Sequence, residues 1–152
     1  MSTVEVAVRV DAPPDLVWSL VSDPTAMAGI TEECTDTRWS AGSSGPEVGA
    51  TFKGRNRSGF RRWTTTCTIV RYERGSEIAW DVAFGPLAVA RWAYRVEPAE
   101  DGGTTISERF EDHRSSGLRL FAPLVRGTSD TAGLNRANMA TTLSRIKSLA
   151  ET

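Results

Sequence analysis

The stretch that decides the fold is residues 129–150, SDTAGLNRANMATTLSRIKSLA. When it is set at helical spacing, its apolar side chains fall on one stripe, which consists of Ala132, Met139, Leu143, Ile146 and Ala150. Hydroxyl and carboxylate side chains at 128–130 could cap the free amides at the start of a helix. A helix of this length would measure about 33 Å, which is roughly the length of a strand of nine or ten residues. The stretch therefore predicts a long C-terminal helix that lies across one face of a sheet.

The residues before this helix have the pattern of strands. In 3–10, TVEVAVRV, valine occupies every second position, which is typical of a half-buried strand. Further segments with strand character follow at 31–39, 50–57, 62–73, 77–84, 87–97 and 104–112. Most of them are separated by short turns with glycine, so consecutive strands are expected to pair as an antiparallel meander. The sequence therefore predicts an α+β fold with an antiparallel sheet of about seven strands.

Three connecting segments are expected to be helical or partly helical. After the first strand, the proline pair at 13–14 suits the first turn of a short helix. Pro24 then opens a second short helix, which we expect to end at Gly29. Before the C-terminal helix, residues 115–127 suggest a short helical piece, and the alternative is a mobile apolar flap over the open end of the sheet.

The composition fits a single domain over residues 1–152, large enough to bury roughly 70% of its unfolded surface. Basic and acidic residues nearly balance, at 18 against 19, so we expect no nucleic-acid partner. The basic cluster at 55–62 is interpreted as a solvated hairpin rather than a contact site for anions.

No apolar run approaches the roughly 20 residues that span a bilayer, and no signal peptide is recognisable. Cys34 and Cys67 are too few for a disulfide framework, so we expect a cytoplasmic protein with reduced thiols and with neither metal nor cofactor.

Most of the chain resembles a known family. The stretches that carry the likeness are DAPPDLVWSLVSDP at 11–24, GATFKGRNRSGFRRWTTTCTIVRYERGSEIAWDV at 49–82, RWAYRVEP at 91–98, and NRANMATTLSRIKSLAE at 135–151. In them the chain resembles the START-like superfamily, also called SRPBCC, and within it the bacterial polyketide cyclase/dehydrase and lipid-transport family. The resemblance implies a helix-grip fold, in which a curved sheet wraps the long C-terminal helix around an apolar ligand cavity. It implies no particular reaction, because these stretches carry no catalytic signature.

Alternation along each strand indicates which residues would face this cavity. Lys53, Arg55 and Arg57 occupy alternate positions of one strand, which assigns the residues between them to the inner face. The predicted ligand-binding residues are Phe52, Asn56, Trp63, Thr65, Trp80, Trp92, Tyr94, Glu108, Phe110, Asn135, Met139 and Thr142. An aromatic-rich face is more often plain core than pocket. This face also carries polar groups, and Gly54 leaves space on it. With these two features, the alternating pattern fits a cavity about as well as it fits a packed core.

Glu108 is the residue of this face most indicative of a functional site. Its candidacy as a catalytic residue rests on this position alone. A carboxylate on an apolar face must be protonated, paired or reached by water, because burying an isolated charge is costly. One interpretation is a protonated acid in the cavity, and the other, which we slightly favour, is an ion pair with an arginine at the open end of the sheet. His113 is the only histidine, and it is interpreted as a surface residue rather than a catalytic base.

Three functions fit these observations. The first is a cytosolic binding protein that holds a small apolar or aromatic molecule between sheet and helix. The second is a cyclase or dehydratase for a polyketide-like substrate, in which Glu108 with Asn56 or Tyr94 would move protons. The third is a protein-interaction module, which an exposed apolar patch around 118–125 would favour. A cavity of roughly 300 Å³ or more would separate the first two from the third.

Overall fold

The computed structural model describes residues 3–27, 30–31, 34–114 and 131–152. Its strands are β1 (Thr3–Val10), β2 (Cys34–Trp39), β3 (Thr51–Ser58), β4 (Arg61–Glu73), β5 (Glu77–Phe84), β6 (Leu87–Pro98) and β7 (Thr104–Asp112). Between β1 and β2 lie the helix α1 (Pro14–Val21) and the 3-10 helix η1 (Pro24–Ala26), and the chain ends in α3 (Thr131–Ala150). Within these ranges no helix is both long and apolar enough to cross a membrane.

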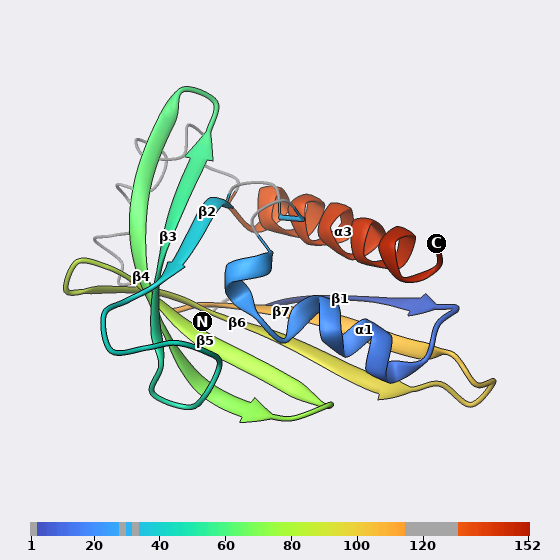
Figure 1. Cartoon of the computed structure of the whole chain (residues 1–152). Coiled ribbons are helices and arrows are strands. Elements are labelled where there is room, and N and C mark those ends of the chain that lie inside the picture. The colour runs from blue at the N-terminus through green and yellow to red at the C-terminus, as the bar shows by residue number, and fades with distance from the viewer. Residues whose placement is uncertain (1–2, 28–29, 32–33, 115–130) are drawn as a thin grey trace.

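The seven strands form one antiparallel sheet in the order β1-β7-β6-β5-β4-β3-β2. From β2 to β7 each strand pairs with the next, as short turns predict, and β1 returns to pair with β7. The sheet curves strongly, so that β3 and β4 rise beside the end of α3 while α3 itself runs above β1 and β7 (Figure 1). The predicted helix-grip fold, with about seven strands on a C-terminal helix, is therefore confirmed.

The strand boundaries follow the alternating pattern closely, with one exception. β2 begins at Cys34 rather than at residue 31. The amides of Ile30 and Thr31 both donate to the carbonyl oxygen of Met27, at 2.9 and 3.1 Å. These bonds close a turn at the position where the sequence suggests an extended chain.

The helix α3 buries the stripe that the sequence predicts. Met139, Leu143, Ile146 and Ala150 are each at most 5% exposed, whereas the side chain of Ala132 lies outside the described part. Two polar contacts at the C-terminal end fix the helix to β1: Lys147 Nζ donates to Arg9 O at 3.1 Å, and the Asp11 amide donates to Glu151 Oε2 at 2.7 Å. The helix is thus held along one edge of the sheet, with its apolar stripe facing the concave side.

The second short helix is shorter than expected. Asp23 caps it by accepting from the Thr25 amide at 2.9 Å, and the Met27 amide already closes a 3-10 turn onto Pro24 O at 3.2 Å. η1 therefore ends at Ala26, because the tight 3-10 geometry seldom extends beyond one turn. The expectation of a short helix or flap at 115–127 falls outside the described residues.

Candidate functional site

A cavity of about 200 Å³ lies between the concave face of the sheet and α3. All twelve residues that the sequence predicts for ligand binding line it: Phe52 and Asn56 on β3, Trp63 and Thr65 on β4, Trp80 on β5, Trp92 and Tyr94 on β6, Glu108 and Phe110 on β7, and Asn135, Met139 and Thr142 on α3. Every strand from β3 to β7 thus contributes to the wall. The role of these residues in ligand binding stays a prediction, because their position shows only that a ligand could reach them.

The alternating sequence pattern predicts these side chains correctly because successive residues of a regular strand point to opposite faces of the sheet. On β3, Phe52 and Gly54 are buried, whereas Lys53, Arg55 and Arg57 are exposed on the outer face. Gly54 also lines the cavity, and its missing side chain leaves room on the inner face. The charged residues mark the outer face of β3, so the residues between them are those that face the cavity.

Aromatic rings form a continuous wall from β2 to β6. The Trp39 ring meets Phe52 edge to face at a centroid distance of 5.7 Å, and Phe52 meets Trp80 in the same way at 5.8 Å. Trp80 in turn lies 5.8 Å from Tyr94. Such offset and edge contacts stabilise aromatic clusters beyond simple burial, so the wall gives the cavity a rigid apolar surface.

Glu108 interrupts this apolar surface and is the only acidic side chain among the described residues that line the cavity. It is 3% exposed and lies directly opposite Tyr94 on β6, whose hydroxyl donates a hydrogen bond to the carboxylate. Its Oε1 atom is buried and has no hydrogen-bond partner among the described residues. Loss of solvation outweighs the hydrogen bond from Tyr94 and raises the pKa of Glu108 from 4.5 to about 8. The carboxyl group is therefore mostly protonated at neutral pH.

The interpretation that Glu108 pairs with an arginine is wrong for the described part of the chain. Arg114, which lines the cavity, instead holds Asp112 through two hydrogen bonds, from Nε at 2.9 Å and from Nη2 at 2.8 Å. Both side chains of this pair are nearly buried, at 10% and 6% exposure. Arg114 and Asp112 neutralise each other, so the pair supplies no net positive charge that would keep Glu108 ionised.

Arg114 is a cavity residue that the sequence analysis missed. It continues the inward-facing set of β7, which runs through Glu108, Phe110 and Asp112 at every second position. The strand ends at Asp112, and Arg114 lies two residues beyond its end. Extending the alternation by one step beyond the strand would have found Arg114.

A bulge explains a second omission. Strict alternation from Trp92 would turn Val89 to the outer face, but Val89 and Ala90 both line the cavity. In the pairing with β5, Val82 faces Ala90 and the next residue, Ala83, faces Ala88, so Val89 is the extra residue of a β-bulge. Because a bulge shifts the phase of a strand, no periodic pattern could have assigned Val89.

Polar groups also occupy the wall away from Glu108. Asn56 Nδ2 donates to Thr65 Oγ1 at 3.1 Å on the β3–β4 side of the cavity. On α3, Thr142 Oγ1 donates to the Asn138 carbonyl oxygen at 2.9 Å, and both residues line the cavity. The cavity therefore combines an aromatic lining with a few fixed polar groups, which is the usual composition of a small-molecule site.

The cavity does not reach the roughly 300 Å³ that would have separated a ligand site or active site from an interaction module. Its volume of about 200 Å³ is nevertheless above the roughly 150 Å³ that suffices for benzene in an engineered protein cavity. The apolar patch expected at 118–125 for an interaction module lies outside the described residues. Size alone thus favours a compact ligand with one or two rings.

Of the other candidate groups, Cys67 lies in the wall of this site and His113 does not. His113 lies 3.5 Å from Glu111 through Nε2 and does not line the cavity. Cys67 is a buried thiol in the cavity wall. The described residues contain no group of three or more histidine, cysteine, aspartate or glutamate side chains that could hold a metal ion.

Solved structures with the same architecture come from several sources. The polyketide-cyclase-like protein Cgl2372 from Corynebacterium glutamicum is 29% identical with a TM-score of 0.59, and the match covers 98% of this chain and 88% of that one. Major latex-like protein 151 from Panax ginseng is 10% identical with a TM-score of 0.72, over 99% and 98% of the two chains. The di-domain ARO/CYC StfQ from the steffimycin biosynthetic pathway is 14% identical with a TM-score of 0.75, over 98% of this chain and 50% of StfQ. The last two matches show the fold alone.

The family itself is shown by the sequence match. No functionally curated protein matches the chain, but the family model described as polyketide cyclase / dehydrase and lipid transport matches residues 1–151. The match covers the sheet, the cavity wall and the whole C-terminal helix. The chain is therefore a START-like (SRPBCC) protein and belongs to the polyketide cyclase/dehydrase and lipid-transport family.

Proposed function

We propose that the protein binds one small, mainly apolar or aromatic molecule in the cavity between sheet and α3. The observation that carries this proposal is the state of Glu108, a buried acid that lines an aromatic cavity and whose Oε1 atom has no hydrogen-bond partner among the described residues. An unsatisfied buried polar group costs about 1–3 kcal/mol. A ligand that forms a hydrogen bond with this group would remove the cost, and its binding would therefore stabilise the protein.

The protonation of Glu108 indicates the polar group that the ligand carries. Tyr94 donates to the carboxyl group, and the protonated acid retains an O–H that needs an acceptor. A carbonyl or phenolic oxygen attached to a ring would accept this hydrogen bond while the ring contacts the aromatic wall. We therefore infer that the ligand is a small aromatic ketone, phenol or related oxygen-bearing compound.

A matched pair of probes tests this inference. Acetophenone and ethylbenzene share a ring and a two-carbon side chain, but only acetophenone offers a carbonyl oxygen. We expect acetophenone to bind about tenfold more tightly, the ratio that one net hydrogen bond supplies. Equal affinities for the two compounds would contradict the assigned role of Glu108, and the absence of binding by both would contradict the cavity as a site.

Two variants locate the effect. Glu108→Leu should abolish the preference for acetophenone, because the donor is removed while the apolar cavity is kept. Glu97→Gln is the matched control, since Glu97 is exposed on the outer face of β6, and it should leave the preference unchanged. Native mass spectrometry of the protein purified from its own host would then identify any retained natural ligand.

A cyclase or dehydratase is the second candidate function, and the same protonated acid favours it. A carboxylic acid with a pKa near 8 can give a proton to a ligand oxygen at neutral pH. Under this hypothesis, Glu108→Gln should keep ligand binding and lose turnover of a polyketide-like substrate. A binding protein without activity would convert no such substrate in either form.

A further inference from the structure

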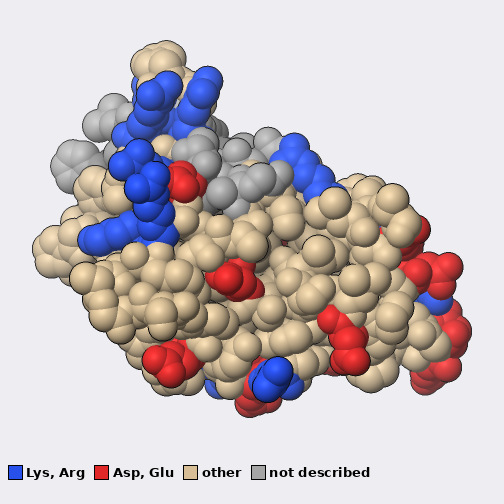
Figure 2. All heavy atoms as spheres, viewed as in Figure 1, with Lys and Arg blue, Asp and Glu red and all other residues tan. Residues whose placement is uncertain are grey.

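The β3–β4 hairpin carries a concentration of positive charge that the cavity does not explain. Residues 53–62 include five basic side chains and no acidic one, namely Lys53, Arg55, Arg57, Arg61 and Arg62, while the rest of the chain holds 13 basic against 19 acidic residues. The hairpin rises above the body of the molecule, and lysine and arginine side chains gather over it (Figure 2). This projecting surface, which we call the basic hairpin, is therefore opposite in charge to the rest of the protein.

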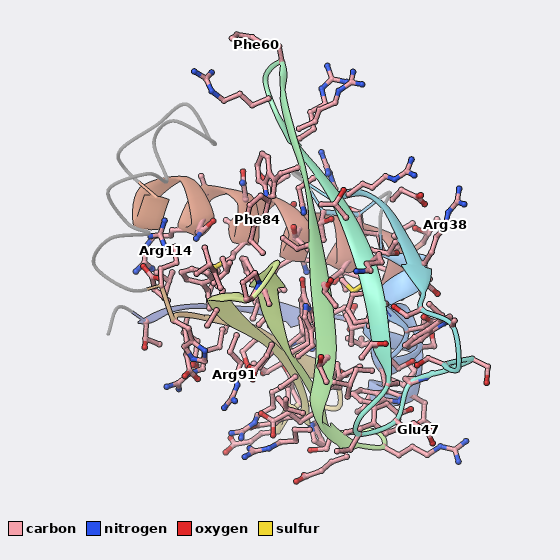
Figure 3. All side chains as sticks on the ribbon, turned by 90° about the vertical axis from the view of Figure 1, so that its left-hand side faces the viewer. Arg38, Glu47, Phe60, Phe84, Arg91 and Arg114 are labelled. Carbon is pink, nitrogen blue, oxygen red and sulfur yellow. The ribbon has the colours of Figure 1, made fainter. Side chains whose placement is uncertain are left out.

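The tip of the basic hairpin presents an exposed aromatic ring. Phe60 is 86% exposed and lies at the apex, at the opposite end of the molecule from Glu47 (Figure 3). Gly59, with φ of +64°, makes the tight turn that places Phe60 there. The guanidinium carbon of Arg61 lies 4.9 Å from the centre of the Phe60 ring. An apolar ring on a convex tip, flanked by cations, has no role in the packing of the fold.

The pairing of the two strands adds a stability cost. Arg57 and Arg62 stand directly opposite each other in the ladder, and both are exposed. Like charges at directly opposed positions destabilise a sheet. The cost would be relieved if an anionic surface lay against the hairpin.

The inner face of the same hairpin belongs to the cavity. Asn56 and Trp63 pair with each other one step from Arg57 and Arg62, and both line the cavity. Whatever the basic hairpin touches therefore lies close to the wall of the ligand site.

We propose that the basic hairpin docks the protein on membranes that contain anionic lipids. Arginines near such a surface bind the headgroups electrostatically, and an aromatic tip gains by entering the interfacial region just below them. A nucleic-acid strand fits this surface less well, because base-stacking proteins use a basic groove that follows the backbone, and here the ring stands on a convex apex. Docking would bring the cavity wall next to the bilayer, where apolar molecules dissolve.

Vesicle flotation with the whole protein tests the proposal. The two preparations are phosphatidylcholine alone and phosphatidylcholine with about one-third phosphatidylglycerol. The wild type should float only with the anionic vesicles, and binding should weaken as salt screens the charges. Arg57→Gln with Arg62→Gln should lower the partition coefficient about 25-fold, at about fivefold for each arginine. Phe60→Ser should lower it several-fold.

Control variants separate docking from general charge or hydrophobicity. Arg74→Gln removes an exposed arginine at the opposite end of β4, and Val48→Ser removes an apolar side chain that is 64% exposed. Both should bind anionic vesicles like the wild type. The proposal is overturned if the hairpin variants bind as these controls do, if neutral and anionic vesicles bind equally, or if a single-stranded oligonucleotide binds more tightly than the anionic vesicles.

Membrane docking and ligand binding can be tested separately, because they use different residues. Phe60→Ser should bind acetophenone normally, because Phe60 does not line the cavity. Glu108→Leu should float with anionic vesicles normally, because Glu108 is buried. Loss of both properties in both variants would contradict the separation of the two surfaces.

Discussion

At the residue scale, the buried acid Glu108 makes stability depend on pH. Its pKa is raised from 4.5 to about 8 in the folded state, so the folded protein holds a proton that the unfolded chain has released. The contribution of Glu108 to stability is therefore full below about pH 4.5 and falls by about 1.4 kcal/mol per pH unit until about pH 8. Glu108→Gln keeps the shape without the ionisation. We expect it to match the wild type at about pH 4 and to exceed it by about 3 kcal/mol at neutral pH.

Chemical denaturation of both proteins across this pH range checks the prediction. The control is Glu97→Gln on the exposed outer face of β6, whose stability should follow the wild type at every pH. If Glu108→Gln were instead less stable than the wild type at neutral pH, Glu108 would be ionised and held by a partner, and its assignment as a proton donor to the ligand would be wrong.

At the element scale, α3 has two halves with different surroundings. Leu143, Ile146 and Ala150 belong to the main core with α1 and the sheet, whereas Asn135 and Met139 line the cavity. The same helix therefore lines the cavity between Asn135 and Thr142 and supplies packed core between Leu143 and Ala150.

Substitution of one residue from each half by tryptophan distinguishes packing from cavity. Met139→Trp should cost little stability, because the larger ring enters the space of the cavity, and it should abolish acetophenone binding. Leu143→Trp, one turn further along, should lose about 1–3 kcal/mol because that site is closely packed. Thermal melts and probe titrations of the two variants provide the measurement. Equal losses of stability, or normal binding by Met139→Trp, would mean that Met139 faces core.

The same scale shows what could be predicted from the sequence. Alternation identified the inward residues wherever charges marked the outer face, as Lys53 and Arg55 do on β3, because the pleat of a strand is strictly periodic. It failed at Val89, where a bulge adds a residue, and at Arg114, which lies beyond the last hydrogen-bonded pair of β7. Val89 has no local signal, because its orientation depends on how two strands are aligned with each other. Arg114, in contrast, follows the alternation of β7 one step past the end of the strand.

The partner of Glu108 could not be predicted for a related reason. A carboxylate in an apolar pattern can be a member of an ion pair, the interpretation that we slightly favour from the sequence, or a protonated acid. The choice depends on whether a nearby cation is already bound elsewhere, and here Asp112 holds Arg114. Which of two carboxylates binds an arginine depends on the tertiary structure and cannot be predicted from the spacing of residues along the chain.

At the scale of the whole molecule, the aromatic wall should report occupancy of the cavity. Trp63, Trp80 and Trp92 line it and are only partly buried, so acetophenone should quench tryptophan emission in a saturable manner. Replacing any one of them by phenylalanine should reduce the response. Trp18→Phe is the control, because Trp18 is buried on α1 away from the cavity lining, and it should leave the fractional change nearly as large. Saturable binding without any change in emission would place the ligand elsewhere.

The return of β1 to β7 has a consequence for how the chain folds during synthesis. In the register Val6 faces Glu108, and Thr104 Oγ1 donates to the carbonyl oxygen of Ala12 at 2.7 Å. The strands from β3 to β6 form local hairpins, which close quickly, whereas pairing across nearly a hundred residues is slow. β1, which is made before the other strands of this sheet, must therefore wait with an unpaired edge until β7 has been made, and α3 docks along β1 later still. A nascent chain that stops short of residue 104 lacks both β7 and α3 and would expose the aromatic wall, so this edge is where we expect chaperones to bind and premature chains to aggregate.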